Sequence, residues 1–220
     1  MARRTERDPL SQDRITQAAM ALADREGLDA VSMRRVGAEL GVEAMSLYRH
    51  VPNKEALLTG MHALMLTEVR HHDGPSGDWK ERLRVVMRSF RGVCLAHPGV
   101  AQLSAKGSTT TVAFTHFEQD LATMGEAGFS PEEAGLALRS LLAFTSGCIM
   151  REITAAVHEH HGSDLAQEEN MRKTAERFPH VAASFPYLVG DTRALTFEYG
   201  LERLLTGIEQ ERGRGSEWTK

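Results

Sequence analysis

The amino-acid sequence predicts an all-α protein built as two helical domains, at residues 1–56 and 57–220. Apolar residues recur with the period of an α-helix along most of the chain, and no segment sustains the alternation of a half-buried strand. Good N-cap residues precede several periodic segments, and glycine or proline follows them. With 220 residues and a hydrophobic content of 41%, the chain is long enough to bury a sizeable core.

The first predicted helix supports the N-terminal domain. Ser11 is a suitable N-cap and Gly27 a suitable helix end, so we expect one helix between them. Such a helix is expected to pack behind the elements that follow and to hold them at a fixed angle. Its apolar positions follow the spacing i, i+3, i+4, i+7 and comprise Ile15, Ala18, Ala19 and Leu22.

Two short helices joined by a glycine turn come next. Ser32 is expected to cap the first of them, and Gly41 to end it, because glycine readily adopts the positive φ of a helix C-cap. The second runs from residue 43 to about 48 and stops before Pro52. Two helices joined by a short turn that contains glycine form a helix-turn-helix, whose second helix enters the major groove of DNA.

The open face of the second short helix favours DNA binding over ordinary packing, although most helical hairpins with a glycine turn bind no DNA. A helix this short offers little packing area, and its exposed side carries polar groups that suit phosphates and base edges. We expect phosphate contacts from Ser32, Arg34, Tyr48 and Lys54. The candidates for contacts with base edges are Ala44, Met45, Ser46 and Arg49. His50 is a further DNA-binding candidate.

This stretch closely resembles the N-terminal domain of the TetR family of bacterial transcriptional repressors. The matching segments are GLDAVSMRRV at 27–36, LGV at 40–42 and LYRHVPNKEALL at 47–58. FTSGC at 144–148 and FEYGLE at 197–202 are similar, more weakly, to the C-terminal domain of the tetracycline-repressor branch. The resemblance implies an N-terminal three-helix helix-turn-helix DNA-binding domain, followed by a larger helical ligand-binding and dimerisation domain.

The rest of the chain is helical in period. Asn53 is expected to cap a helix that links the two domains and runs to about Arg70. Ser130 and Glu133 form a capping box, with proline at the first helical position between them. Residues 179–190 contain two prolines and are expected to be irregular. The other expected elements are a loop at 71–78, helices at 78–97, 110–128, 131 to about 158, 164–178 and 191–212, and a short segment at 100–106.

Composition narrows the possible classes of function. A formal net charge of −4 argues against a generally basic surface, so any contact with DNA must come from a local patch. Cys94 and Cys148 lie in apolar helical surroundings and are interpreted as reduced core residues. No apolar run approaches the roughly 20 residues of a transmembrane helix. The N-terminus also lacks the apolar segment of a signal peptide, and we therefore expect a cytoplasmic protein.

Metal and catalytic sites have little support in the sequence. His158, His160 and His161 lie where a helix runs into a loop, and no third ligand accompanies them at a familiar spacing. The same argument applies to His71 and His72. G-x-S-x-G, H-E-x-x-H, P-loop and G-x-G-x-x-G motifs are missing from the sequence. We therefore expect no metal, no cofactor and no enzyme activity.

The resemblance places a small-molecule pocket in the C-terminal helices. Phe90 falls at a pocket-lining position of the tetracycline-binding branch. The positions that would hold or support its magnesium ion are Ser104 and Arg151 here, neither a suitable ligand, so we expect an apolar, aromatic or polycyclic effector that needs no metal. Phe and Met at these positions also suit an ordinary core. The candidate effector-binding residues are Leu66, Val69, Arg70, Val86, Phe90, Leu103, Phe117, Phe144 and Arg151.

The function that these observations favour is a ligand-responsive transcriptional repressor. It is expected to bind a palindromic operator as a homodimer, with helices around 134–157 and 195–208 pairing as a four-helix bundle, and to be released by a small apolar effector. One alternative is a regulator of the same fold that a partner protein controls, or that responds to no ligand. A more remote alternative is an enzyme.

Overall fold

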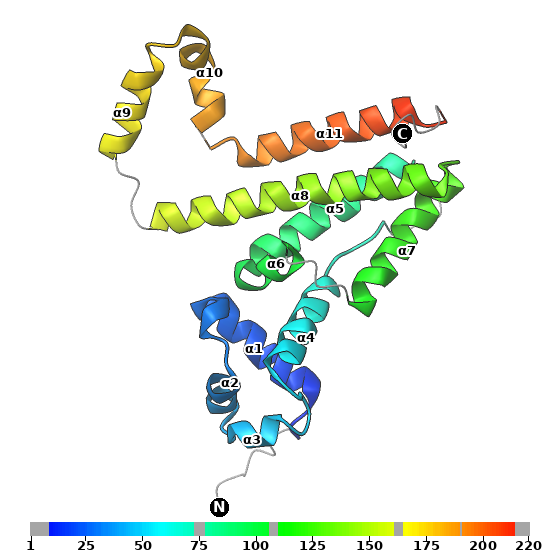
Figure 1. The fold of residues 1–220 in the computed structure, drawn as a ribbon, viewed down its shortest axis with the longest axis vertical. Coiled ribbons are helices and arrows are strands. Elements are labelled where there is room, and N and C mark those ends of the chain that lie inside the picture. The colour runs from blue at the N-terminus through cyan, green and yellow to red at the C-terminus, as the bar shows by residue number, and fades with distance from the viewer. Residues whose placement is uncertain (1–8, 73–77, 106–109, 161–164, 190, 214–220) are drawn as a thin grey trace, which may run out of the picture. The chain divides into compact units, whose positions relative to one another are not determined.

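A computed structural model describes residues 9–72, 78–105, 110–160, 165–189 and 191–213. In these ranges the chain forms α-helices, one 3₁₀ turn and no strand, which confirms the all-α fold class (Figure 1). The elements are α1 Gln12–Glu26, the 3₁₀ turn η1 Leu28–Ala30, α2 Met33–Leu40, α3 Ala44–Leu47, α4 Lys54–Leu66, α5 Trp79–Ala96, α6 Pro98–Ala105, α7 Thr111–Glu126, α8 Pro131–His160, α9 Leu165–Ala175, α10 Pro179–Val189 and α11 Arg193–Glu211.

The described residues form two compact units. The first contains the residues up to His71 together with Arg88–Gln119, and the second contains His72–Met87 and the residues from Asp120 onward. Helices α5 and α7 therefore contribute residues to both units. The domain boundary at residue 56 stays a prediction.

The expected caps form at the helix ends. The side chains of Ser11, Ser32 and Asn53 each accept a backbone N–H three residues further on, at 3.2, 3.2 and 2.8 Å. The capping box closes in both directions, because the Ser130 N–H donates to Glu133 Oε2 at 2.8 Å and the Glu133 N–H donates to Ser130 Oγ at 3.3 Å. These predictions of local structure are confirmed.

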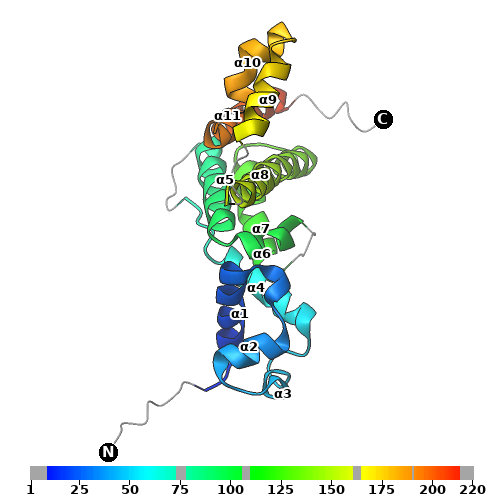
Figure 2. The same ribbon diagram turned by 90° about the vertical axis from the view of Figure 1, so that its left-hand side faces the viewer.

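Helices α1, α2 and α4 pack around the core of the first unit (Figure 2). Ile15 and Leu22 of α1 and Leu57 and Met61 of α4 are fully buried, and Val36 adds the apolar face of α2. Burial of apolar surface contributes about 25 cal/mol per Å². The three helices share this core, so each one depends on the other two.

Helices α8 and α11 lie side by side in the second unit (Figure 1). Phe197, Leu201 and Leu205 recur at i, i+4, i+8 of α11 and are fully buried. Gly200 lies between them, where a Cβ atom would be only 2.2 Å from Cζ of the Phe144 ring of α8. Any larger residue at that position must displace the ring.

The first half of α5 is tied to α11 by ion pairs inside the second unit. Arg84 donates two hydrogen bonds to the Glu202 carboxylate, from Nε at 2.6 Å and from Nη2 at 3.0 Å. A second ion pair joins the same two helices, with Lys80 Nζ 2.5 Å from Glu209 Oε2. The bidentate geometry fixes the guanidinium relative to α11.

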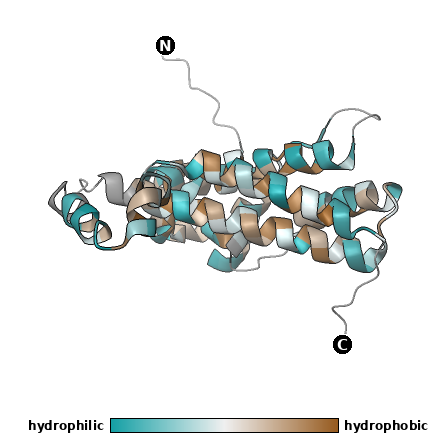
Figure 3. Ribbon diagram, turned by 90° about the horizontal axis from the view of Figure 1, so that it is seen from above, coloured by the Kyte–Doolittle hydropathy of each residue, from teal (hydrophilic) through white to brown (hydrophobic). Residues whose placement is uncertain are grey.

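Polar and apolar residues alternate along the helices (Figure 3). Several large apolar side chains of the second unit stay exposed, among them Leu195 and Tyr199 of α11 at 61% and 63%, and Leu136 of α8. A search of the described helices finds none that is long and apolar enough to span a bilayer.

Three expectations about the elements need correction. The segment 179–190, expected to be irregular, forms helix α10 with Pro186 inside it. Pro179 occupies the first helical position, where no N–H is needed, and Pro186 falls in the last turns, so only the end of the hydrogen-bond ladder is affected. The linking helix ends at Leu66 and not near Arg70. The short segment at 100–106 is the larger part of helix α6, which begins at Pro98.

Candidate nucleic-acid interface and effector site

The turn between α2 and α3 has the geometry of a helix-turn-helix. Gly41 ends α2 in the left-handed region with φ 67°, as predicted. The Val42 N–H then donates to the carbonyl of Gly37 at 2.9 Å, which folds the chain back over the last turn of α2. A Cβ atom at position 37 would lie 2.9 Å from the Val42 carbonyl oxygen. The close approach of the turn to α2 therefore needs glycine inside the helix.

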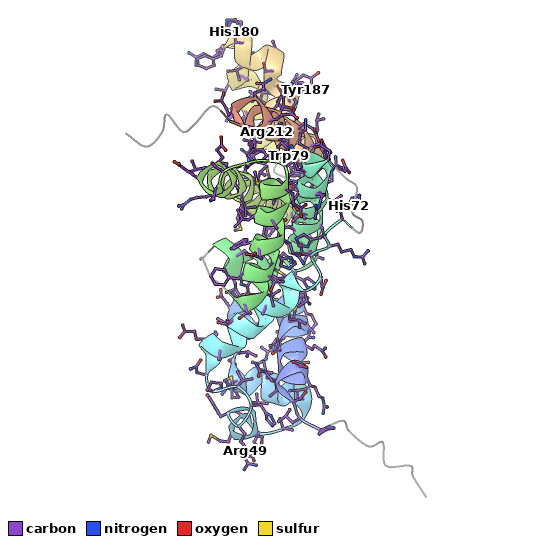
Figure 4. All side chains as sticks on the ribbon, turned by 90° about the vertical axis from the view of Figure 1, so that its right-hand side faces the viewer. Arg49, His72, Trp79, His180, Tyr187 and Arg212 are labelled. Atoms are coloured by element: carbon purple, nitrogen blue, oxygen red, sulfur yellow. The ribbon has the colours of Figure 1, made fainter. Side chains whose placement is uncertain are left out.

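Helix α3 presents its outer face to solvent. Leu47 is fully buried and anchors the helix, whereas Met45 is 71% and Tyr48 44% exposed. Arg49 follows the helix at the surface of the first unit, where Figure 4 labels it. The helix is shorter than predicted, since residues 48–50 form a turn. Of the remaining candidates for DNA contact, His50 is exposed, and Ala44 and Ser46 are half-buried.

The predicted phosphate-binding residues lie at the start of α2, directly after α3 and at the start of α4. Ser32 Oγ accepts the backbone N–H of Arg35, which leaves its hydroxyl hydrogen free to donate to a phosphate oxygen. Arg34 and Lys54 are exposed. Within the ranges that the structure describes, Arg34, Arg49 and Lys54 form no ion pair. Their charges are therefore not neutralised by a neighbouring carboxylate.

A different pair of arginines braces the same unit. Arg25 of α1 donates to Glu39 of α2 at 2.6 Å, and Arg35 of α2 donates to Glu26 of α1 at 2.6 Å. The hydrogen bond from Arg35 holds the pKa of the Glu26 carboxyl below its usual value. These crossed contacts hold α1 at a set angle to α2, and the sequence analysis did not identify them.

The candidate effector residues divide between the two units. Leu66, Val69, Phe90 and Leu103 are buried in the first unit. In the same unit, Phe117 is half-buried and the Arg70 side chain is exposed. In the second unit Val86 is buried, Phe144 is half-buried against Phe197, and Arg151 is exposed. The proposed roles of all nine residues stay predictions.

A polar contact between buried His62 and half-buried Ser104 lies in the same unit as these four buried residues. His62 of α4 is 3% exposed, and its Nε2 lies 2.9 Å from Ser104 Oγ of α6. Ser104 also forms a hydrogen bond with the buried thiol of Cys94. Burial raises the pKa of that thiol to about 12. The thiol is therefore neutral and unreactive. The signal for this pair in the sequence is one histidine among the leucines and methionines of α4.

The histidines considered as metal ligands form no metal site in the described part of the chain, where no group of three or more His, Cys, Asp or Glu side chains has a suitable arrangement. His71 instead stacks on the ring of His116, with centroids 4.9 Å apart. His72 is half-buried after it (Figure 4). The side chains of 158–161 lie outside the described residues. In the described part of the chain, neither Cys94 nor Cys148 forms a disulfide; Cys94 is buried as predicted, whereas Cys148 is only half-buried.

Two family models match the chain. Residues 15–61 match the model for bacterial regulatory proteins of the tetR family, and residues 72–212 match the model for the tetracyclin repressor-like C-terminal domain.

Characterised relatives match over almost the whole chain. The tetracycline repressor protein class E of Escherichia coli is 30% identical over 207 residues, which cover 92% of both chains. The HTH-type transcriptional repressor DrrR1 of Streptomyces coeruleorubidus is 32% identical and covers 97% of this chain and 85% of its own. The crystal structure of the TetR family protein ActR of Streptomyces coelicolor in complex with actinorhodin is 29% identical, with a TM-score of 0.84, and covers 96% of this chain and 100% of its own.

We predict that Gly37→Ala lowers the free energy of unfolding by about 1–3 kcal/mol, because the new Cβ atom meets a backbone carbonyl that cannot rotate away. Urea unfolding followed by circular dichroism measures the change. Ala38→Ser, on the exposed side of the same helix, is the control and should alter stability by less than about 0.5 kcal/mol. Equal midpoints for the two variants would show that the turn tolerates a side chain.

Proposed function

Since the chain belongs to the tetR family of bacterial transcription regulators, we propose that it is a homodimeric repressor that binds a palindromic operator and is released by a small apolar effector. The observation that carries the DNA-binding half is the outer face of α3, a surface of exposed Met45, Tyr48 and Arg49 on a helix anchored by buried Leu47. Unpaired cations at its edges suit phosphates. A regulator of this kind works in the cytoplasm, where the DNA is.

Two-fold symmetry follows from the operator. A dimer places one α3 in each of two half-sites about one helical turn apart, so a palindromic operator mirrors the symmetry of the protein. We assign the dimer contact to α8 and α11, whose exposed Leu136, Leu195 and Tyr199 lie in one unit. Exposed large apolar side chains of this number favour a partner surface. The pairing of these helices with their symmetry mates makes a four-helix bundle.

The effector half of the proposal rests on relatives and on the interior of the first unit. ActR binds actinorhodin in a crystal structure that matches nearly the whole chain. Leu66, Val69 and Phe90 provide apolar surface at the end of α4 and on α5, and buried His62 with Ser104 adds one polar group. We assign the effector to this side of α4. A ligand there displaces α4, which begins directly after the α3 turn and carries Lys54.

Two alternatives remain distinct from this proposal. A regulator of the same fold that answers to a partner protein, or to no ligand, would bind the operator but no small apolar compound. An enzyme would need convergent polar groups, whereas the related proteins are transcription regulators. Titrations of the purified dimer with apolar compounds distinguish the first alternative from the proposal, because only the proposed repressor should bind such a compound.

We predict that Tyr48→Ala and Lys54→Ala weaken binding to all DNA sequences alike, because both residues are assigned to phosphates. Lys54→Ala should also reduce the slope of log K against log salt by about 1. Met45→Ala should change sequence preference instead, since it faces base edges. Gel-shift assays with randomised duplexes measure both effects, and Gln102→Ala, exposed on α6, is the control. Normal binding by Tyr48→Ala would refute the groove assignment.

We predict that Tyr199→Glu converts the dimer to a monomer, because a charge at the proposed contact would be buried without a partner. Sedimentation velocity reports the change in mass. Ala122→Glu adds the same charge to the exposed face of α7 and should leave the dimer intact. An unchanged dimer for Tyr199→Glu would place the contact elsewhere.

We predict that the effector and the operator weaken each other's binding by the same factor. Calorimetric titration of a panel of apolar aromatic compounds, with actinorhodin as the first member, is run with and without an operator duplex selected by the protein. Phe90→Leu should lower effector affinity about tenfold through lost packing, and Phe129→Leu, a buried phenylalanine of the second unit, should not. Equal effector affinity with and without the duplex would disprove release.

A further inference from the structure

His97 is the only residue between helices α5 and α6, and both helices fix its backbone. Its N–H donates to the Val93 carbonyl at 3.1 Å, which completes α5. Its own carbonyl accepts the N–H groups of Val100 and Ala101 at 3.0 and 2.9 Å, which begins α6. The imidazole therefore projects from a rigid corner.

The ring of His97 bridges two carboxylates from other elements of the same unit. Nδ1 lies 2.8 Å from Asp24 Oδ2 on α1, and Nε2 lies 3.3 Å from Glu68 Oε2 just after α4. The side chain of His97 is only 17% exposed. Asp24 and Glu68 pair with no other cation in the described part of the chain.

Both contacts are hydrogen bonds only when the ring is charged. An ionised carboxylate only accepts hydrogen bonds, so contacts from both ring nitrogens need a hydrogen on each of them. A neutral imidazole carries one N–H, and its other nitrogen presents a lone pair. When the ring loses its proton, one contact turns from attraction into repulsion, and neither carboxylate has another cation within the described residues to compensate.

The contacts of His97 with Asp24 and Glu68, called the bridge below, lie where the start of α6 packs closely against the end of α1. A Cβ atom at Gly99, the second residue of α6, would lie 2.8 Å from the carbonyl oxygen of Ala23. Helix α6 also packs against α4 (Figure 2). Three elements thus meet at His97: α1, the end of α4, and the corner between α5 and α6.

Two further polar contacts hold the end of α4, and neither depends on the charge of His97. His116 Nε2 donates to the Leu66 carbonyl at 2.9 Å, and the Arg70 N–H donates to Ser89 Oγ at 2.8 Å. They attach the end of α4 to α7 and α5, whereas the bridge attaches it to α1. Within the described residues, the bridge is a polar contact that joins the end of α4 to α1, in addition to the apolar packing of the two helices.

We propose that His97, as an imidazolium, is a positioning residue for DNA binding: it locks α1 to the end of α4, so operator affinity falls as pH rises through the range in which the ring loses its proton. The proposal rests on the proposed function. A looser α1 transmits its motion to α2 through the Arg25 and Arg35 contacts, and α3 moves with α2. DNA binding then requires α1, α2 and α3 to be ordered again, which lowers affinity.

The test uses the full-length dimer and a fluorescent duplex that the wild-type protein selects from a random pool at about pH 6. Anisotropy titrations give the affinity of each variant between about pH 6 and pH 8. The wild-type affinity should fall about threefold to tenfold over this range, as expected for one partly exposed charged contact. His180→Gln changes an exposed histidine of the second unit and should keep the wild-type profile.

Two variants should flatten the pH profile at opposite levels. In His97→Gln the side chain never carries a charge, so affinity should stay at the low level found for the wild type at high pH. In Glu68→Gln the new amide N–H donates to the bare Nε2 of the neutral ring, while Nδ1–H still donates to Asp24, so affinity should stay at the high level. A purely structural role for His97 does not predict a rescue by Glu68→Gln. Equal pH profiles for the wild type and Glu68→Gln would overturn the proposal.

A DNA-free measurement separates this proposal from the function it rests on. Nitrogen-15 NMR of the imidazole should show both His97 nitrogens protonated at about pH 6, with the amide signals of Asp24 and Glu68 shifting together as the ring is deprotonated. A bridge seen by NMR without any pH effect on affinity would overturn the positioning role and leave DNA binding intact. Failure to bind any duplex would instead refute the proposed function, while the NMR signature would still report on the bridge.

Discussion

The proposed DNA-binding surface depends on the close contact between α2 and the turn that precedes α3. Helix α3 has four residues, too few to be stable by itself. It is held by the burial of Leu47 and by the turn that folds onto Gly37, where no side chain fits. Because these contacts lie on the inner side, the outer residues Met45 and Tyr48 contribute little to the fold. In the proposed function, Met45 and Tyr48 can therefore contact DNA without being needed for stability.

Local signals in the sequence predicted the N-terminal caps of several helices, whereas contacts between residues far apart in the sequence could not be predicted from it. The caps at Ser32 and Asn53 depend on a backbone group three residues away, so the sequence contains both partners in order. The requirement for glycine at position 37 arises from a carbonyl that only the folded turn brings near. Residues 179–190 were predicted wrongly because two prolines were counted without regard to position. A proline in the first or last turn removes few hydrogen bonds.

The effector residues show why composition does not separate a core from a binding site. Apolar residues at helical spacing suit both, and the phenylalanines of one unit range from buried Phe90 to Phe114, which is 62% exposed. A polar pair is more informative, because a core alone gains nothing from burying it. His62 with Ser104 is such a pair, in an otherwise apolar stretch of α4. The sequence around His62 carries no local sign of this contact, because Ser104 lies 42 residues further along the chain.

The energies involved are consistent with the proposed control of DNA binding from the end of α4. Allosteric coupling between effector and operator typically amounts to about 1–3 kcal/mol. Losing the packing of a buried leucine or phenylalanine, as in its replacement by alanine, costs about 2–5 kcal/mol, so a mechanism that opened the core would approach the total stability of a domain. The polar contacts at Leu66, Glu68 and Arg70 are worth about 1 kcal/mol each. Exchanging one or two of them matches the coupling energy, so the proposed shift of α4 does not require its buried residues Leu57 and Met61 to lose their packing.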